Sequence, residues 1–179
     1  MYHLKSISMK ALIHSVLAAS IIAMLVLGCK NEQDNNDPAG ITGRLLGNSA
    51  CKDLKSAATT NALSDSLSCA EYQFDTSTHQ LTIKHINAGF NCCPGNLSCK
   101  VTASGDTIVI QEFEESQLCS CNCLFDLEIE IVGVEAGKYV IKFIEPYCGN
   151  QTPLIFDVDL AGDPEGSFCV IRNQYPWGI

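Results

Sequence analysis

The sequence predicts an all-β domain, an antiparallel β-sandwich that disulfide bonds staple together. Three observations support this fold class. Turn-forming residues recur about every 8–12 residues over most of the chain, a spacing typical of sandwiches. The segments between these turns are rich in β-branched and aromatic residues, and no long amphipathic helix interrupts them. Ten of the 11 cysteines lie after residue 50.

The first half of the domain contains four expected strands. They cover residues 69–75, 79–87, 99–103 and 106–113. The last two flank Ser104-Gly105, a hairpin-turn signal. Before the first of the four strands, residues 55–67 (KSAATTNALSDSL) fit a short helix or a loop, which a bond between Cys51 and Cys69 would clamp.

The second half contains a longer alternating run and three further strands. The run covers residues 118–132, and residues 138–145 return from a turn at 134–137. Residues 153–160 and 167–172 are expected to form a last pair around the turn AGDPEG.

Two stretches resemble known proteins. The segment DLEIEIVGVEAGKYVIKFIE resembles hairpins of Ig-like and prealbumin-like β-sandwich domains. The stretch from NAGFNCCPG to CSCNCLFDL, together with the YPWG tail, resembles an uncharacterised family of cysteine-rich secreted bacterial proteins. The first is a resemblance of fold, which carries no function, and the second implies no activity.

The N-terminus has the composition of an export signal. Lys5 and Lys10 precede an apolar run at residues 16–27 (VLAASIIAMLVL). A helix of this length reaches about 18 Å, which is short of the roughly 30 Å hydrocarbon layer of a membrane. A basic start, a short apolar run and a small residue at its end describe a secretory signal.

The end of this run, Val26-Leu27-Gly28-Cys29, resembles the lipobox of bacterial lipoproteins. The resemblance implies a signal peptide at residues 1–28, cleavage before Cys29, and attachment to the membrane through lipid on that cysteine, palmitate included. Residues 29–40 then form a flexible acidic tether, and residues 41–179 form the cysteine-rich domain. The alternatives are an ordinary signal peptide and an uncleaved anchor, with Cys29 incidental in both.

Charge and sorting signals narrow the location. Lys30 follows Cys29 where an Asp would retain a lipoprotein in the inner membrane, so the resemblance implies the outer membrane, on the periplasmic side or at the cell surface. After removal of residues 1–28, nine basic and 20 acidic residues remain, a net charge of −11. This charge argues against a nucleic-acid partner.

The cysteines are expected to be structural. With Cys29 lipidated, ten remain, and an even number in an oxidising compartment predicts five disulfides of undetermined connectivity. The ten candidates are Cys51, Cys69, Cys92, Cys93, Cys99, Cys119, Cys121, Cys123, Cys148 and Cys169.

The most unusual local pattern is Cys119-Ser-Cys121-Asn-Cys123. In a strand without a bulge, these three side chains share one face with Phe125, Leu127 and the following odd-numbered residues, and that face is predicted to be the core. Cysteines two apart on one strand cannot bond to each other, because their Cβ atoms are too distant. Cys92, Cys93 and Cys99 are therefore the predicted partners, and adjacent Cys92 and Cys93 are expected to reach different cysteines.

A metal site is the alternative for the same cysteines. Short-spaced thiolates suit Cu(I) or Zn. His85 shares the parity of Leu81 and Ile83 and is expected to point inward, as a core histidine or as a further ligand. The alternative ligand set is therefore His85, Cys92, Cys93, Cys119, Cys121 and Cys123. Thiol–disulfide exchange by these cysteines is a third reading, and the main interpretation includes no cofactor.

No enzyme motif stands out. The acidic residues Glu112, Glu114 and Glu115 are read as the solvated end of a strand, and the tail at residues 175–178 as a plug on the sandwich edge or as a ligand-stacking pair. The sequence therefore predicts a cell-envelope lipoprotein that acts as a binding or structural module, with a protein or glycan as its unspecified ligand. A metal-binding or thiol-redox lipoprotein is the alternative, and an enzyme is less favoured.

Overall fold

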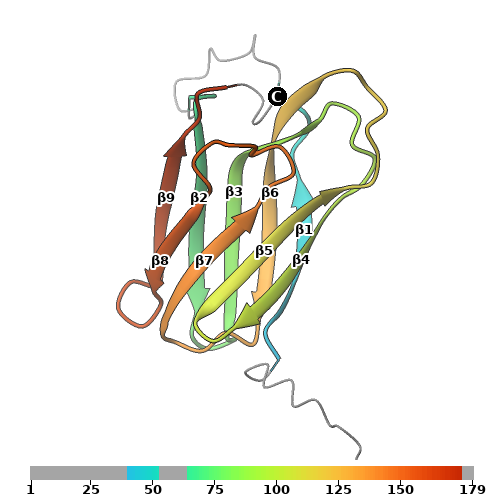
Figure 1. Ribbon diagram of the computed structural model, residues 1–179. Coiled ribbons are helices and arrows are strands. Elements are labelled where there is room, and N and C mark those ends of the chain that lie inside the picture. Colours follow the sequence, from blue (N-terminus) through green and yellow to red (C-terminus); the bar gives the residue numbers. More distant parts are fainter. Residues whose placement is uncertain (1–39, 53–63, 175–179) are drawn as a thin grey trace, which may run out of the picture. The chain divides into compact units, whose positions relative to one another are not determined.

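The structure is a computed structural model that describes residues 40–52 and 64–174, all of them in the compact unit Asn36–Ile179. Nine strands and no helix occur among these residues (Figure 1). The strands are β1 (Thr42–Asn48), β2 (Leu67–Asp75), β3 (Gln80–Asn91), β4 (Leu97–Ser104), β5 (Thr107–Glu114), β6 (Asn122–Val132), β7 (Lys138–Ile144), β8 (Ile155–Asp159) and β9 (Glu165–Ile171).

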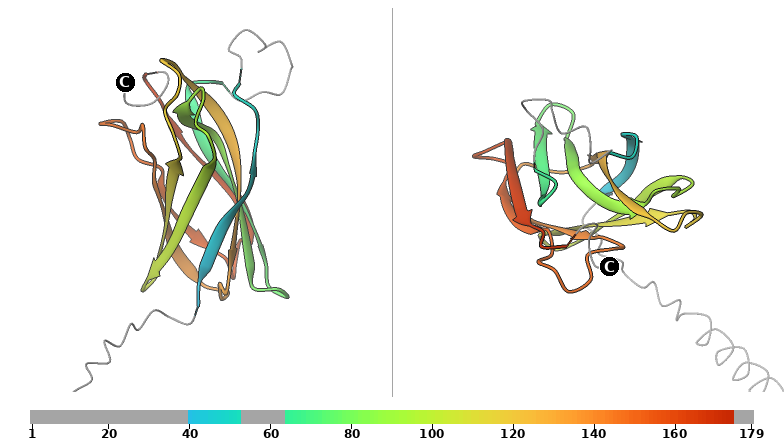
Figure 2. Two further views of the ribbon diagram at one scale, coloured as in Figure 1. Left: turned by 90° about the vertical axis from the view of Figure 1, so that its right-hand side faces the viewer. Right: turned by 90° about the horizontal axis from the view of Figure 1, so that it is seen from above.

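The strands form two sheets that face each other. The first sheet has the order β1-β6-β3-β2-β9, and the second has the order β4-β5-β7-β8. The second sheet crosses in front of the first in Figure 1, and the view turned by 90° in Figure 2 separates the two layers. The predicted all-β, disulfide-linked sandwich is therefore confirmed.

The core lies between the sheets and follows from side-chain alternation. Leu127, Ile129 and Ile131 of β6 are fully buried, and so are Ile108 and Ile110 of β5. In β6 the odd-numbered residues from 123 to 131 face inward without a break, as predicted.

In β3 the alternation shifts at a bulge. The pairing of β3 with β6 changes register between His85 and Ala88, and Asn87 lies there with a positive φ of 62°. Asn is one of the few residues that accept this conformation. Because of the bulge, His85 on one side and Ala88 and Phe90 on the other all face the core.

Several pairings differ from the sequence prediction. Strand β1 (Thr42–Asn48) lies where the sequence predicted no strand. The expected hairpin between β6 and β7 does not form, because β6 already pairs with β1 and β3, while β7 lies in the other sheet. There β7 pairs in parallel with β5, so the sandwich is not entirely antiparallel.

The predicted last pair is also wrong. Strand β8 pairs with β7, whereas β9 pairs with β2 in the opposite sheet. The connection between β8 and β9 therefore passes from one layer to the other.

A glycine marks the point where the chain leaves the first sheet after β6. Gly133 has a φ of +78°, and a Cβ atom there would lie 2.8 Å from the carbonyl oxygen of Gly40. Val134 follows it and is fully buried. The chain thus turns inward across the end of the sandwich and reaches β7 in the second sheet.

Three sequence predictions fall outside the described residues. They are the signal at 1–28, nearly all of the tether at 29–40, and the tail at 175–178. Most of the segment read as a short helix or loop is outside them too. Within the described part of the chain, no helix has the length and hydropathy needed to cross a membrane.

Candidate functional site

Four disulfides form among the described residues. They join Cys51 to Cys123, Cys69 to Cys169, Cys92 to Cys121 and Cys93 to Cys119. Of the three predicted partners of the 119–123 group, Cys92 and Cys93 are confirmed and bond to different cysteines. Cys99 is wrong as the third partner, because Cys123 bonds to Cys51. The clamp between Cys51 and Cys69 is wrong, because each of them bonds elsewhere.

The expectation of five disulfides is corrected to four, because Cys99 and Cys148 are free thiols. Cys99 lies on β4 opposite Glu112 of β5. Cys148 follows β7, and its Sγ accepts a hydrogen bond from Arg172 Nη1 at 3.2 Å. Burial, with the charge of Glu112, raises the pKa of Cys99 to about 11.

The inward orientation of all three clustered cysteines is also corrected. Strand β6 begins at Asn122, so Cys119 and Cys121 precede it. Cys123 is buried, whereas Cys121 is exposed. The alternating run predicted from residue 118 is therefore shorter by four residues at its start.

Two of the disulfides lie next to each other. The Sγ atoms of Cys51, Cys92 and Cys123 are all within 4.8 Å of one another, and Cys92 is bonded to Cys121. His85, the sixth member of the alternative ligand set, lies elsewhere, with both ring nitrogens in hydrogen bonds to other side chains.

Those hydrogen bonds belong to a buried charged network between the two sheets, made of Ser68, His85, Glu112, Glu145 and Arg172. All five are buried residues. His85 Nδ1 lies 2.6 Å from Glu112 Oε1, and His85 Nε2 lies 2.9 Å from Ser68 Oγ. Arg172 Nη2 donates to both carboxylate oxygens of Glu145, at 2.7 and 2.6 Å.

The network joins both layers of the sandwich. Ser68, His85 and Arg172 come from β2, β3 and the end of β9 in the first sheet, and Glu112 and Glu145 come from β5 and the end of β7 in the second. The paired charges offset the large cost of burying each ion alone. The network therefore joins the two sheets by polar contacts near the start of β2 and the ends of β5, β7 and β9.

Burial and pairing oppose each other in setting the protonation of His85. Burial by itself lowers the pKa of this histidine, but the charge and hydrogen bond of Glu112, helped by Glu145, hold the pKa above its ordinary value. Burial raises the pKa of Glu112, and His85 offsets part of that rise. Each group therefore affects the protonation of the other in a fully buried site.

The reading of Glu112 as solvated is corrected. Glu112 lies on the same face of β5 as Ile108 and Ile110, so it points into the core. The same parity places Glu145 in line with Ile141 and Phe143 of β7. The alternation of apolar residues in the sequence thus indicates that both glutamates face the core.

Ser68, His85 and Glu112 are connected in the order of a Ser-His-acid triad. Such a triad needs a substrate carbonyl next to the serine oxygen. Ser68 has an exposed fraction of 0%, so no substrate reaches its Oγ in this structure. In the described state, the arrangement joins the sheets and leaves no room for a reacting group.

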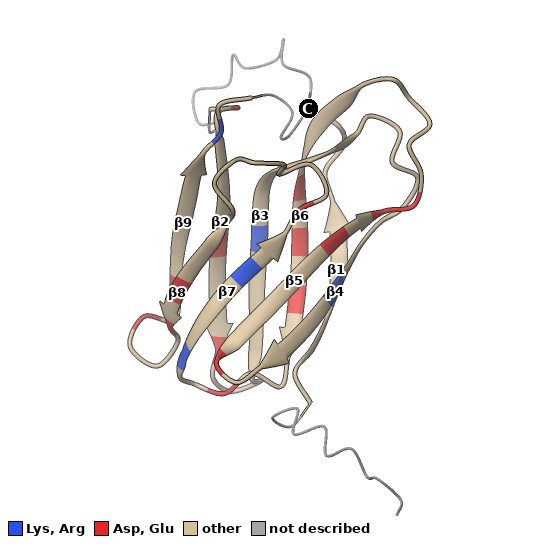
Figure 3. Ribbon diagram, viewed as in Figure 1, with Lys and Arg blue, Asp and Glu red and all other residues tan. Residues whose placement is uncertain are grey.

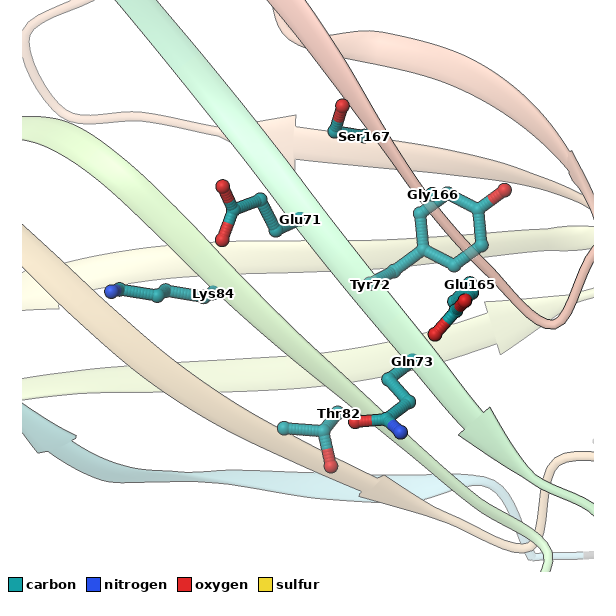
Figure 4. Close-up of a pocket in the computed structure, with 8 residues that line it drawn as sticks. All are labelled: Glu71, Tyr72, Gln73, Thr82, Lys84, Glu165, Gly166 and Ser167. Atoms are coloured by element: carbon teal, nitrogen blue, oxygen red, sulfur yellow. The ribbon is translucent and has the colours of Figure 1, made fainter. Parts of the chain in front are cut away.

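The accessible surface offers shallow polar grooves on both sides of Tyr72. One groove, of about 570 Å³, lies on the outer face of the first sheet (Figure 4). Its polar side chains come from β2, β3 and β9, and Glu71 and Lys84 lie in register across the first two of these strands. A second groove of similar size brings Tyr72 and Tyr139 together with Asp106, Asp157 and other acidic residues.

Gly166 leaves space for Tyr72 on the inner side of the first sheet. The Tyr72 ring shares the face of Ala70 and Phe74 and stacks on Phe156 of β8. A Cβ atom at this position of β9 would lie 2.7 Å from the Tyr72 hydroxyl oxygen, so the glycine leaves space for the phenol. Burial, and the charges of Asp163 and Asp159, raise the pKa of Tyr72. The phenol is thus an uncharged group that can both donate and accept hydrogen bonds.

Charge is distributed along the strands rather than collected into one basic patch. Figure 3 shows acidic residues spaced along β6, with basic residues on the neighbouring strand β3 and on β7.

Comparison with known protein families, curated proteins and solved structures found no match for this chain. The functional argument therefore depends on the chain's own residues.

Proposed function

We propose that this chain is a lipid-anchored binding module of the bacterial cell envelope, held at the outer membrane through Cys29. The observation that carries the proposal is the set of four disulfides. Disulfides persist in exported proteins and are rare in the reducing cytosol. They fit a chain that begins with an export signal, and the lipobox at Cys29 supplies the anchor.

The anchor is tested by separating membranes from soluble material in cells that express the full chain. We expect the wild-type chain in the outer-membrane fraction with radiolabelled palmitate attached. Cys29→Ala should release the chain or leave it unprocessed, because diacylglycerol cannot attach. Cys99→Ala is the matched control, since it removes a free thiol and should change neither property. A Cys29→Ala chain that is still cleaved and still membrane-bound contradicts the proposal.

For the ligand, we propose a glycan bound at the outer groove of Figure 4. Glu71 lies in register with Lys84 on one side and Ser167 on the other, so acceptors and donors stand side by side on the outer face. Hydroxyl-rich sugars need donors and acceptors together. The groove is shallow and open, which suits an extended polymer better than a small apolar molecule.

Binding is tested with the full chain in detergent on immobilised envelope polysaccharide, including purified peptidoglycan. Glu71→Ala/Lys84→Ala should weaken retention about tenfold, because two hydrogen bonds to charged groups are lost. Lys100→Ala on the exposed face of β4 is the control and should bind as the wild type does. Equal retention of wild type and the double variant would remove the groove from the proposal.

A further inference from the structure

Three chain segments lie side by side at one end of the first sheet. The amide of Lys52 donates to the carbonyl of Leu124 at 2.9 Å, which places the chain after β1 beside β6. On the other side, the amide of Cys92 donates to the carbonyl of Cys121 at 2.9 Å and extends the β3–β6 pairing. Cys51 and Cys92 therefore approach the central segment from opposite sides.

The central segment contributes two of the cysteines. Cys121 lies just before β6, and Cys123 lies two residues later on the strand. One bonds to Cys92 and the other to Cys51, so the two disulfides cross the segment next to each other. This arrangement explains why three sulfurs of different segments come within 4.8 Å.

We propose that Cys51, Cys92, Cys121 and Cys123, when reduced, form a tetrathiolate site for a soft divalent ion such as zinc. Four thiolates around zinc form a closed tetrahedral site with Zn–S bonds of about 2.3 Å, which sets neighbouring sulfurs roughly 3.8 Å apart. The sulfurs of Cys51, Cys92 and Cys123 already lie within 4.8 Å of one another, and the bond from Cys92 to Cys121 brings a fourth sulfur next to them.

The reaction that opens the site is a dithiol reduction. Each disulfide accepts two electrons and two protons from one dithiol, which is itself oxidised to a disulfide. Two equivalents of dithiol thus give four thiols. On binding, the ion replaces the four thiol protons, which leave to solvent.

The other cysteines and the histidine lie outside this ligand set. Cys93 and Cys119 bond to each other, so their disulfide includes none of the three sulfurs that lie within 4.8 Å, whereas Cys121 is bonded to one of them. Both ring nitrogens of His85 are engaged with Ser68 and Glu112. An all-sulfur set favours zinc or Cu(I) over calcium or magnesium, which take oxygen ligands.

The site is tested with cobalt(II) as a spectroscopic probe for zinc. The full chain in detergent is reduced without oxygen, cobalt is titrated, and far-ultraviolet circular dichroism follows the fold. We expect a thiolate-to-cobalt charge-transfer band that saturates at one ion per chain and is displaced by zinc. The chain that keeps its disulfides should show no such band.

Two double variants decide the ligand set. Cys92→Ser/Cys121→Ser should reduce the bound cobalt from one ion per chain to none. Cys93→Ser/Cys119→Ser removes the neighbouring disulfide as a matched control and should keep the band and its stoichiometry. A reduced chain that unfolds and refolds only when cobalt is added also supports the site. Absence of the band in the reduced wild type, or equal loss in both variants, overturns the proposal.

Discussion

At the scale of single residues, the protonation of His85 controls how strongly the two sheets are joined. His85 is fully buried, and it connects Ser68 of its own sheet with Glu112 of the other. When protonated, His85 forms an ion pair with Glu112. When the proton is lost, the buried carboxylate has a neutral neighbour and its burial costs more free energy.

This gives stability a definite dependence on pH. The pKa of His85 in the folded chain is above its ordinary value of 6.5. The folded chain therefore binds this proton more tightly than the unfolded chain does. The stabilisation is fully present below pH 6.5 and is lost as the pH rises through the folded-state pKa, with a slope of at most about 1.4 kcal/mol per pH unit.

We expect the free energy of unfolding, measured with urea at a series of pH values with the disulfides intact, to fall as the pH rises above 6.5. His85→Gln/Glu112→Gln should remove this fall, because it removes both titrating groups and leaves the Glu145–Arg172 pair in place. His79→Gln, at an exposed histidine, is the control and should keep the wild-type slope. Parallel pH profiles for wild type and the double variant would show that the pair does not titrate as described.

At the scale of elements, the sequence predicted the positions of most strands, but it did not predict which strands pair. Alternation of apolar residues located most of β2, β3 and β5, because each has one face on the core. It missed β1, whose residues alternate only between exposed and half-buried positions. Such a strand at a sheet edge contributes few fully buried side chains, so its hydrophobic pattern is weak.

Pairing was harder to predict because it depends on distant parts of the chain. The turn after β6 looks like a hairpin, but β1 and β3, which come earlier in the sequence, occupy both edges of β6. The pairing of all three strands must be known before it is clear that β6 has no free edge for β7.

The candidate site was predicted in the same uneven way. Parity placed His85 in the core, and spacing excluded bonds within the 119–123 group. The same argument from side-chain alternation places Glu112 on the face of Ile108 and Ile110, but its acidic neighbours suggested a solvated strand end. Cys51 entered the cluster through its backbone pairing beside β6, which spacing alone does not reveal.

At the scale of the whole domain, the covalent cross-links divide unequally between the two layers. All four disulfides join strands of the first sheet or segments next to them. The second sheet carries only the two free thiols, Cys99 on β4 and Cys148 after β7. In the described part of the chain, apolar packing and the buried charged network therefore hold the second sheet onto the first.

This division predicts how the free thiols react. In the denatured, unreduced chain, iodoacetamide followed by peptide mapping should label Cys99 and Cys148 and none of the eight bonded cysteines. In the folded chain Cys99 should react far more slowly than Cys148, because burial raises its pKa to about 11 and only the thiolate is nucleophilic.

Labelling of Cys99 should then report separation of the sheets, since this thiol lies against Glu112 in the second sheet and becomes accessible when the layers part. His85→Gln should accelerate it, because the variant removes the ion pair that joins the first sheet to Glu112, while Glu112 itself stays beside Cys99 and the bonded cysteines stay unlabelled. Unchanged Cys99 labelling in that variant would mean that the contact between His85 and Glu112 does not limit how often the sheets separate. Complete protection of both thiols in denaturant would mean that they are bonded to each other.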